Sequence, residues 1–206
     1  MRPTHILYLH GFRSSPQSTK AQMLAQAVQR CASDAAPLVW ACPQLPPSPR
    51  EAIDGLMTLT ANWPRDSMVV IGSSLGGFYA TVMGQRLGCP VAVINPAVAP
   101  ARDLARYIGE QSSFHNPEDR FFFRPEFIDE FRSLNPYPIT QPQRYWALIA
   151  KGDEVLNWQE MVAHYPGAQL HLLEGSDHAV SDFAMHLPEL MAFLGLTANS
   201  DGETPR

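Results

Sequence analysis

Short apolar segments alternate with longer amphipathic segments along most of the chain. Each apolar segment ends in Gly, Pro or a polar residue, which is typical of β-strands. These segments cover residues 5–9, 37–41, 67–72, 91–96, 145–150 and 168–175. The first five are mostly continuous in apolar character, which is typical of parallel strands buried on both faces. The pattern therefore predicts a sheet of about six mainly parallel strands.

Helical patterns lie between these strands. They cover residues 18–31, 155–164 and 181–194, and two further helices are predicted to begin near Ser48 and at Leu75. Ser48 followed by Pro49 and Glu51 combines a capping box with proline at the first helical position. Pro188 is expected to kink or divide the last helix. Strands alternating with helices predict an α/β fold with right-handed crossovers and helices on both faces of the sheet.

Residues 111–143 do not fit this alternation. The segment is rich in Phe and Pro and predicts one short helix near residues 125–133. An insertion of this kind between strands is expected to be a lid or cap over a site, with the cover of a sheet edge as the alternative. We expect residues 1–196 to form a single domain and the polar residues 197–206 to be a flexible tail.

Composition narrows the class of protein. The 206 residues carry a net charge of −5 with no run of Lys or Arg, which argues against a nucleic-acid partner. Cys31, Cys42 and Cys89 are far apart and have no CxxC spacing, so neither a disulfide framework nor a metal site is predicted. The apolar run at the N-terminus is shorter than a signal h-region, and no segment has the length of a membrane span. We therefore expect a cytoplasmic protein with no membrane partner.

A motif for nucleophilic chemistry lies in the sequence Gly72-Ser73-Ser74-Leu75-Gly76. It matches the pattern G-x-S-x-G only when Ser74 is the central residue. A nucleophile on a tight strand-to-helix turn has a strained backbone, and glycine is needed on both sides because neighbouring side chains would collide there. An apolar strand precedes the motif and an amphipathic helix follows it. We therefore predict that Ser74 is the nucleophile and that Ser73 is a spacer.

A serine nucleophile needs a base and an acidic residue that orients the base. With this motif the acidic residue is expected next along the chain and the histidine after it. Asp153 and His178 each follow a predicted strand, where the crevice of a parallel sheet opens. Glu154 and Asp177 are the alternative acids, but neither position favours contact with the histidine ring. We predict Asp153 as the acid and His178 as the base.

The first predicted strand runs directly into His10 and Gly11. In a sheet with this motif, that position supplies a second backbone amide to an oxyanion hole. We expect the two donors to be the amides of Phe12 and Leu75. The side chain of His10 is expected to hydrogen-bond the loop and to take no part in catalysis.

Four segments match, in order, the pattern of a known family: "ILYLHGFRSSPQSTKA", "IGSSLGGFYAT", "KGDEVL" and "GSDHAVSDF". Over most of residues 5–195 the chain resembles the α/β-hydrolase fold, and more narrowly the small bacterial YqiA-like esterases. The resemblance implies a compact form of the fold without its first antiparallel strands. It also implies a triad of Ser74, Asp153 and His178 and the hydrolysis of short acyl esters or thioesters.

The predicted function is therefore acyl transfer to water, with no metal or organic cofactor. Four phenylalanines of the insertion either line an apolar acyl pocket or simply cover the sheet: Phe114, Phe121, Phe122 and Phe123. The same triad also serves peptidases and carbon–carbon hydrolases, and a binding protein on a hydrolase fold is a further alternative. The sequence predicts neither the natural substrate nor the oligomeric state.

Overall fold

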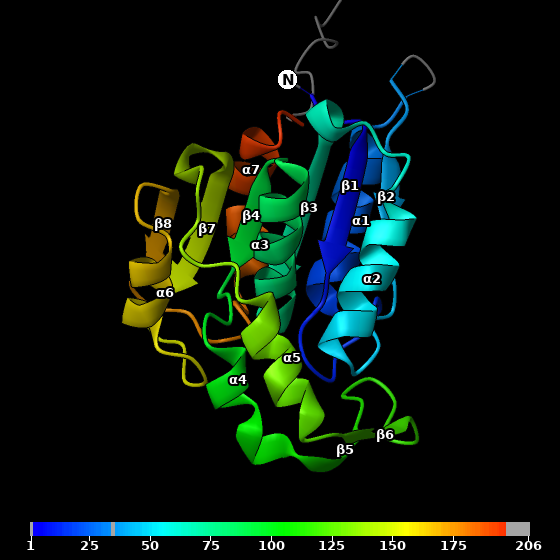
Figure 1. The fold of residues 1–206 in the computed structure, drawn as a ribbon. Coiled ribbons are helices and arrows are strands. Elements are labelled where there is room, and N and C mark those ends of the chain that lie inside the picture. Colours follow the sequence, from blue (N-terminus) through cyan, green and yellow to red (C-terminus); the bar gives the residue numbers. More distant parts are fainter. Residues whose placement is uncertain (1, 34–35, 197–206) are drawn as a thin grey trace, which may run out of the picture.

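A computed structural model describes residues 2–33 and 36–196. The predicted flexible tail, residues 197–206, lies outside the described residues. Six strands form one fully parallel sheet in the order β2-β1-β3-β4-β7-β8 (Figure 1). The strands are β1 (His5–Leu9), β2 (Val39–Ala41), β3 (Met68–Ser73), β4 (Val91–Ile94), β7 (Tyr145–Ala150) and β8 (Gln169–Leu173). The prediction of about six mainly parallel strands is confirmed.

Helices cover both faces of the sheet because its strands bury side chains on both faces. Leu7, Leu9 and Val70 pack under α2 (Pro49–Leu59), α3 (Leu75–Leu87) and α6 (Trp158–His164). Ile6 and Val69 pack under α1 (Thr19–Cys31) and α7 (Phe183–Phe193) on the opposite face. Figure 1 shows the two layers of helices with the sheet between them. The continuous apolar character of these strands is explained by this double burial.

The chain reverses its direction across the sheet between β1 and β3. From β1 it crosses to β2 at one edge, and then returns to β3 on the other side of β1. Leu9 at the end of β1 lies opposite Gly72 in β3. In parallel sheets, the crevice at the carboxyl ends of two such strands is the usual ligand site. The His10–Gly11 loop and the Ser74 turn both start at this point.

The insertion is larger than predicted and lies between β4 and β7. It contains α4 (Pro100–Asp103), the antiparallel hairpin β5 (Gly109–Ser112) and β6 (Arg120–Phe123), and the expected short helix α5 (Glu126–Leu134). Figure 1 shows the hairpin beyond the carboxyl ends of the central strands. A role as a lid stays a prediction.

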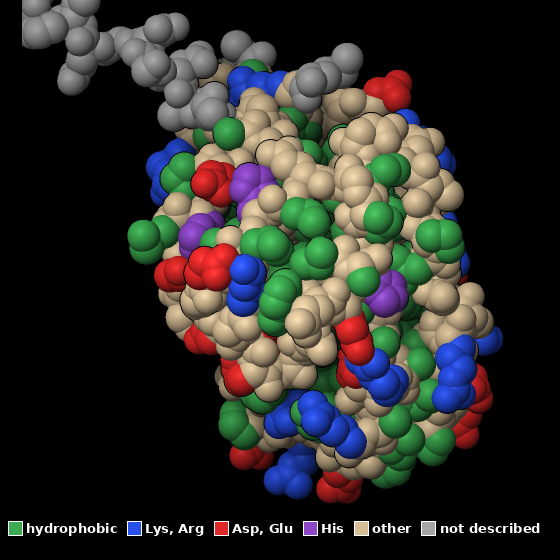
Figure 2. Space-filling view, turned by 90° about the vertical axis from the view of Figure 1, so that its left-hand side faces the viewer, with side chains coloured by type: hydrophobic (Ala, Val, Ile, Leu, Met, Phe, Trp, Pro, Cys, Tyr) green, Lys and Arg blue, Asp and Glu red, His purple; other side chains and the backbone are tan. Residues whose placement is uncertain are grey.

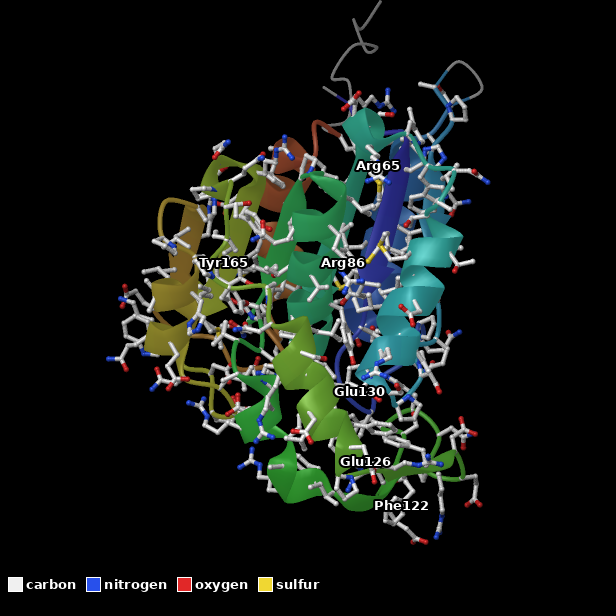
Figure 3. All side chains as sticks on the ribbon, viewed as in Figure 1. Arg65, Arg86, Phe122, Glu126, Glu130 and Tyr165 are labelled. Carbon is white, nitrogen blue, oxygen red and sulfur yellow. The ribbon has the colours of Figure 1, made fainter. Side chains whose placement is uncertain are left out.

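The N-terminus of α2 holds the insertion to the body of the protein. As predicted, the Ser48 hydroxyl caps this helix and accepts a hydrogen bond from the Glu51 amide at 3.2 Å. The reciprocal bond of the predicted capping box, from the Ser48 amide to the Glu51 carboxylate, is not formed among the described residues. A carboxylate from α5 lies at this helix end, where Glu130 (labelled in Figure 3) accepts bonds from Ser48 Oγ at 2.7 Å and from the Arg50 amide at 3.0 Å. A carboxylate at a helix N-terminus is stabilised by the helix dipole.

The last helix, α7, contains a proline. α7 runs unbroken from Phe183 to Phe193 with Pro188 inside it, so the predicted division is wrong. A proline removes only one helical hydrogen bond, and Phe183 and Leu190 hold α7 in the core on either side of it.

No helix within residues 2–33 and 36–196 is both long and apolar enough to cross a membrane. On the face drawn in Figure 2, acidic and basic side chains are interspersed.

Candidate active site

Ser74 lies on a strained turn between β3 and α3. Its backbone has φ 55° and ψ −122°, a conformation that residues with side chains rarely adopt. The turn is held by hydrogen bonds, since the Ser74 amide donates to the Ile94 carbonyl at 3.0 Å and the Ser74 carbonyl accepts from the Ala97 amide at 3.0 Å. The side chain of Ser74 is therefore presented at the carboxyl edge of the sheet, directly before the N-terminus of α3.

Glycine is required on both sides of this turn for steric reasons. A Cβ at Gly72 would lie 2.1 Å from the Gly76 carbonyl oxygen, and a Cβ at Gly76 would lie 1.9 Å from the Leu9 carbonyl oxygen. Both contacts are with backbone atoms, which are fixed by the sheet. The spacing G-x-S-x-G therefore reflects the close packing of α3 against β1 and β3.

We expect Gly76→Ala to lower the free energy of unfolding by roughly 3 kcal/mol or more, because the added methyl group overlaps the backbone of β1. The matched control is Gly55→Ala in α2, where nothing lies within 4 Å of the added atom. Alanine is the better helix former, so this control is expected to raise the free energy of unfolding by roughly 0.5–1 kcal/mol. Urea denaturation of both variants measures the difference, and equal stabilities would contradict the steric argument.

Three of the predicted site residues form one chain of hydrogen bonds. The Ser74 hydroxyl lies 3.0 Å from His178 Nε2, and His178 Nδ1 lies 2.7 Å from Asp153 Oδ2. The Asp153 side chain has no exposed surface, and its Oδ1 accepts bonds from the amides of Val155 and Leu156, both at 2.8 Å. Hydrogen bonds to both carboxylate oxygens thus hold the Asp153 side chain in one orientation. The structure therefore brings Ser74, His178 and Asp153 together from the ends of β3, β8 and β7.

The two alternative acids have other contacts. Glu154 accepts a hydrogen bond from the His178 amide at 2.9 Å and so holds the backbone of the histidine loop. Asp177 accepts bonds from the Ser181 amide at 2.8 Å and from the Ser181 hydroxyl at 2.6 Å. These bonds from Ser181 lower the pKa of Asp177. Both acids support the loop that carries His178, and Asp153 alone of the three contacts its ring.

Asn95 is a supporting residue that the sequence analysis missed. It is fully buried at the end of β4, with the positive φ of 40° that asparagine tolerates better than most residues. Its Nδ2 donates to the carbonyls of Asp177 at 3.0 Å and His178 at 3.1 Å, while its Oδ1 accepts from the Ala150 amide at 2.7 Å. One amide side chain thus ties the histidine loop to β7. Its position at the carboxyl end of a buried strand was the available signal.

Asn95→Ala is expected to lower the free energy of unfolding by roughly 2–4 kcal/mol, because it leaves the Ala150 amide and the His178 carbonyl without a partner and removes one of the two hydrogen bonds to the Asp177 carbonyl. The matched control is Asn116→Ala on the exposed turn of the hairpin, which is expected to change stability by no more than about 0.5 kcal/mol. Urea denaturation measures both. A loss at Asn95 no greater than that at Asn116 would contradict the supporting role.

The two backbone amides predicted to bind an oxyanion belong to Leu75, which follows Ser74, and to Phe12, which follows Gly11. A Cβ added to Gly11 would be 3.2 Å from Ser74 Cβ, which shows how closely the β1 loop approaches the serine. Within the described part of the chain, the amides of Phe12 and Leu75 donate to no protein atom. Leu75 is also the first residue of α3, where the helix dipole favours negative charge. Both amides are therefore free to donate to a ligand.

His10 contacts the loop, as expected. The side chain is 3% exposed; its Nδ1 lies 3.0 Å from the Gly11 carbonyl oxygen, and its Nε2 accepts a bond from the Leu45 amide at 3.2 Å. Burial lowers the pKa of His10, which favours the neutral ring that these two bonds require. The ring thus ties the loop after β1 to the Pro-rich segment before α2.

Two pockets meet at this edge of the sheet. The smaller, about 180 Å³, contains Ser74 and His178 and is otherwise mostly apolar, with Leu104, Tyr107 and Leu156 among its walls. The larger, about 700 Å³, lies between the loop after β1, the Pro-rich segment and the β5–β6 hairpin. Within residues 2–33 and 36–196, no three His, Cys, Asp or Glu side chains are grouped closely enough to hold a metal ion.

The four phenylalanines of the insertion do not act together. Phe114 lines the smaller pocket and Phe121 the larger one. Phe122 and Phe123 line neither of these two pockets, so their position does not support the predicted role in an acyl pocket. Successive residues of β6 face opposite sides: Phe122 is 56% exposed and points away from the body (Figure 3), whereas Phe123 is buried in the core beside Phe12.

A parallel sheet with this strand order, a serine on a strained strand-to-helix turn, and a histidine and an acid after later strands define the α/β-hydrolase fold. Within that class the chain belongs to the uncharacterised protein family UPF0227, whose model matches residues 5–195. This assignment confirms the resemblance found in the sequence.

Solved structures support the fold. The chain superimposes with a TM-score of 0.69 and 17% identity on a structure of the metagenome-derived lipolytic enzymes LipS and LipT, covering 94% of each chain. For Est1E from Butyrivibrio proteoclasticus with ferulic acid bound, the TM-score is 0.68 at 11% identity, covering 95% of this chain and 91% of that one. For α/β-hydrolase domain-containing protein 10 from mouse, it is 0.65 at 16% identity, covering 92% and 90%.

Proposed function

We propose that the protein is a serine hydrolase that cleaves small carboxylic esters or thioesters through an acyl-enzyme. One observation carries the proposal: the unbroken chain of hydrogen bonds from the Ser74 hydroxyl through His178 to the buried Asp153 carboxylate. A serine hydroxyl is a weak nucleophile at neutral pH, and an adjacent oriented base is what activates it.

In the proposed mechanism, Ser74 Oγ attacks the acyl carbonyl while His178 Nε2 accepts its proton. Asp153 keeps the other ring nitrogen protonated and stabilises the imidazolium that forms. The proton then passes from His178 to the leaving oxygen or sulfur, which departs as an alcohol or thiol. Water then attacks the acyl carbon while His178 Nε2 accepts its proton. The proton passes to Ser74 Oγ as the bond between the acyl carbon and Oγ breaks, and the carboxylic acid is released. No step of this mechanism requires a metal or an organic cofactor.

The negative charge of each tetrahedral intermediate is assigned to the amides of Phe12 and Leu75. Neither amide donates to a protein atom within the described residues, and the close approach of Gly11 to Ser74 supports the assignment. Preorganised donors of this kind contribute roughly 3 kcal/mol each to the transition state. The smaller pocket supplies an apolar wall on the His178 side for a hydrocarbon group.

Ester chemistry is favoured over the other reactions of this fold by the neighbours in structure. LipS and LipT are described as lipolytic enzymes, and Est1E is described with ferulic acid bound; these descriptions concern those proteins. The small volume of the pocket beside Ser74, about 180 Å³, favours a small acyl or alcohol group. From the cysteine pattern we also propose a reducing compartment, the cytoplasm.

A hydrolysis panel tests the proposed reaction. Matched esters, thioesters and anilides of the same acyl group are incubated with the purified chain and with Ser74→Ala as the control. We expect turnover of esters or thioesters by the unmodified chain at rates well above those of the control. Turnover of the anilide alone would support a peptidase instead, and no turnover of any member would contradict the proposed function.

A further inference from the structure

The two pockets at the carboxyl edge share a narrow boundary. Among the described residues, three line both pockets: Phe12, Arg13 and Leu75. The backbones of Phe12 and Leu75 are accounted for by the proposed oxyanion binding. Arg13 has the longest side chain of the three, and the proposed mechanism gives it no role.

Arg13 is held in an unusual backbone conformation at the tip of a tight turn. Its φ is 60°, and the Ser14 amide donates to the Gly11 carbonyl at 3.2 Å across the turn. From this position its Nε donates to the Ser112 carbonyl at 2.7 Å. The left-handed conformation therefore aims the side chain across the site at the β5–β6 hairpin.

The partner of the guanidinium on the hairpin is Phe114. The Arg13 guanidinium carbon lies 4.3 Å from the centre of the Phe114 ring, and the Phe114 amide donates to the Arg13 carbonyl at 2.8 Å. Phe114 is 66% exposed, so its contacts with Arg13 are a large part of what holds the ring in place. We call this pair the Arg13–Phe114 stack.

The stack lies where the two pockets adjoin. Phe114 lines the smaller pocket, whereas its neighbours Ser113 and His115 line the larger one. Arg13 lines both. The two side chains therefore lie between the smaller pocket of about 180 Å³, which contains Ser74, and the larger pocket of about 700 Å³. The smaller volume lies below the roughly 300–1,000 Å³ of typical small-molecule pockets, whereas the larger one lies within that range.

We propose that the Arg13–Phe114 stack is a partition that limits the length of the apolar substrate group the site accepts. The inference rests on the proposed ester hydrolysis. With the stack in place, a group bound beside Ser74 ends against the Phe114 ring. Without it, the two pockets join, and a longer group extends from one into the other. Arg13 and Phe114 are then specificity-determining residues.

Two variants remove the partition from opposite sides. Arg13→Gly deletes the side chain and suits the left-handed backbone, so the turn that carries the Phe12 amide is kept. Phe114→Ala deletes the ring from the exposed end of the hairpin. The matched control is Phe122→Ala, which removes the same ring from the same hairpin at a residue that lines neither pocket.

The measurement is kcat/KM over two series of esters. One varies the acyl chain from two to ten carbons with a nitrophenyl leaving group, and the other varies the alkyl alcohol over the same lengths with an acetyl group. We expect the ratio of kcat/KM for long to short substrates to rise by roughly tenfold or more in Arg13→Gly and Phe114→Ala, in one of the two series. If the ratio rises in the acyl series, the acyl group is the one that contacts the stack; if it rises in the alcohol series, the alcohol group is. Phe122→Ala is expected to keep the ratio of the unmodified chain.

Three outcomes would overturn the proposal. The first is that Arg13→Gly and Phe114→Ala hydrolyse the shortest esters but keep the original length preference in both series. The second is that Phe122→Ala shifts the preference as much as they do, because the effect would then come from general loosening of the hairpin. The third is that the unmodified chain hydrolyses no ester in either series, which refutes the ester hydrolysis on which this inference rests and leaves the partition no substrate to limit.

Discussion

Ser74→Ala and His178→Ala are each expected to lower kcat for ester hydrolysis by roughly 10⁵- to 10⁶-fold. The reason is their direct contact: Ser74 Oγ lies 3.0 Å from His178 Nε2, so the nucleophile and its base act as one unit. Without the base the hydroxyl keeps its proton, and without the hydroxyl the base has nothing to activate. The double variant is therefore expected to be about as inactive as either single variant.

Steady-state kinetics on a short-chain nitrophenyl ester measures these losses. The matched control is Ser73→Ala, because Ser73 is the adjacent serine and is the last residue of β3. We expect the control to retain kcat within about tenfold, since the lost hydroxyl lies outside the proposed proton path. Losses at Ser74 and His178 that multiply in the double variant would contradict their action as a unit.

Asp153→Asn is expected to lower kcat by roughly 10⁴-fold while leaving the fold intact. Oδ1 of Asp153 accepts bonds from the amides of Val155 and Leu156, so the oxygen of an asparagine is held at that position. Its NH₂ group then faces His178 Nδ1, which must accept rather than donate. The proton of the neutral ring moves to Nε2, and this nitrogen is no longer able to accept the proton of Ser74.

The control for this change is Glu154→Gln at the adjacent acid. Glu154 accepts a bond from the His178 amide, and the carbonyl oxygen of glutamine accepts the same bond. We expect less than about a tenfold change in kcat for the control. Circular dichroism of both variants verifies folding. If Glu154→Gln lost more activity than Asp153→Asn, the assignment of the orienting acid would be contradicted.

The sheet was predictable from the sequence because its four central strands, β1, β3, β4 and β7, are buried on both faces. β7, residues 145–150, is apolar at every position and buried at every position. The turn at Ser74 was predictable for a different reason. Its close backbone contacts require glycine two residues before and two residues after the serine, and this spacing can be read in the sequence. The positions of Asp153 and His178 followed from the ends of predicted strands.

The β5–β6 hairpin was not predictable from the sequence, nor was it predictable which of its phenylalanines are buried. β5 has the sequence Gly-Glu-Gln-Ser, which carries no apolar alternation, and its partner β6 contains three consecutive phenylalanines. Three equal side chains in a row do not show which face is buried. The buried face is decided by packing against Phe12, which contacts both Phe121 and Phe123 and lies more than 100 residues earlier in the chain.

The supporting residues were missed because their contacts are with backbone atoms. Asn95 binds the carbonyls of Asp177 and His178, more than 80 residues further along the chain. Glu154 binds the amide of His178. A backbone group is the same at every position, so the sequence carries no sign of which one a side chain meets. These contacts follow from how the loops return to the sheet.

The central claim is that Ser74 is an activated nucleophile, and covalent labelling tests it most directly. The purified chain and Ser74→Ala are treated with a fluorophosphonate probe, and the modified residue is located by mass spectrometry. We predict a single modification at Ser74 of the unmodified chain and none in the variant. A folded chain that is not labelled, or that is labelled at Ser73 instead, would contradict the account.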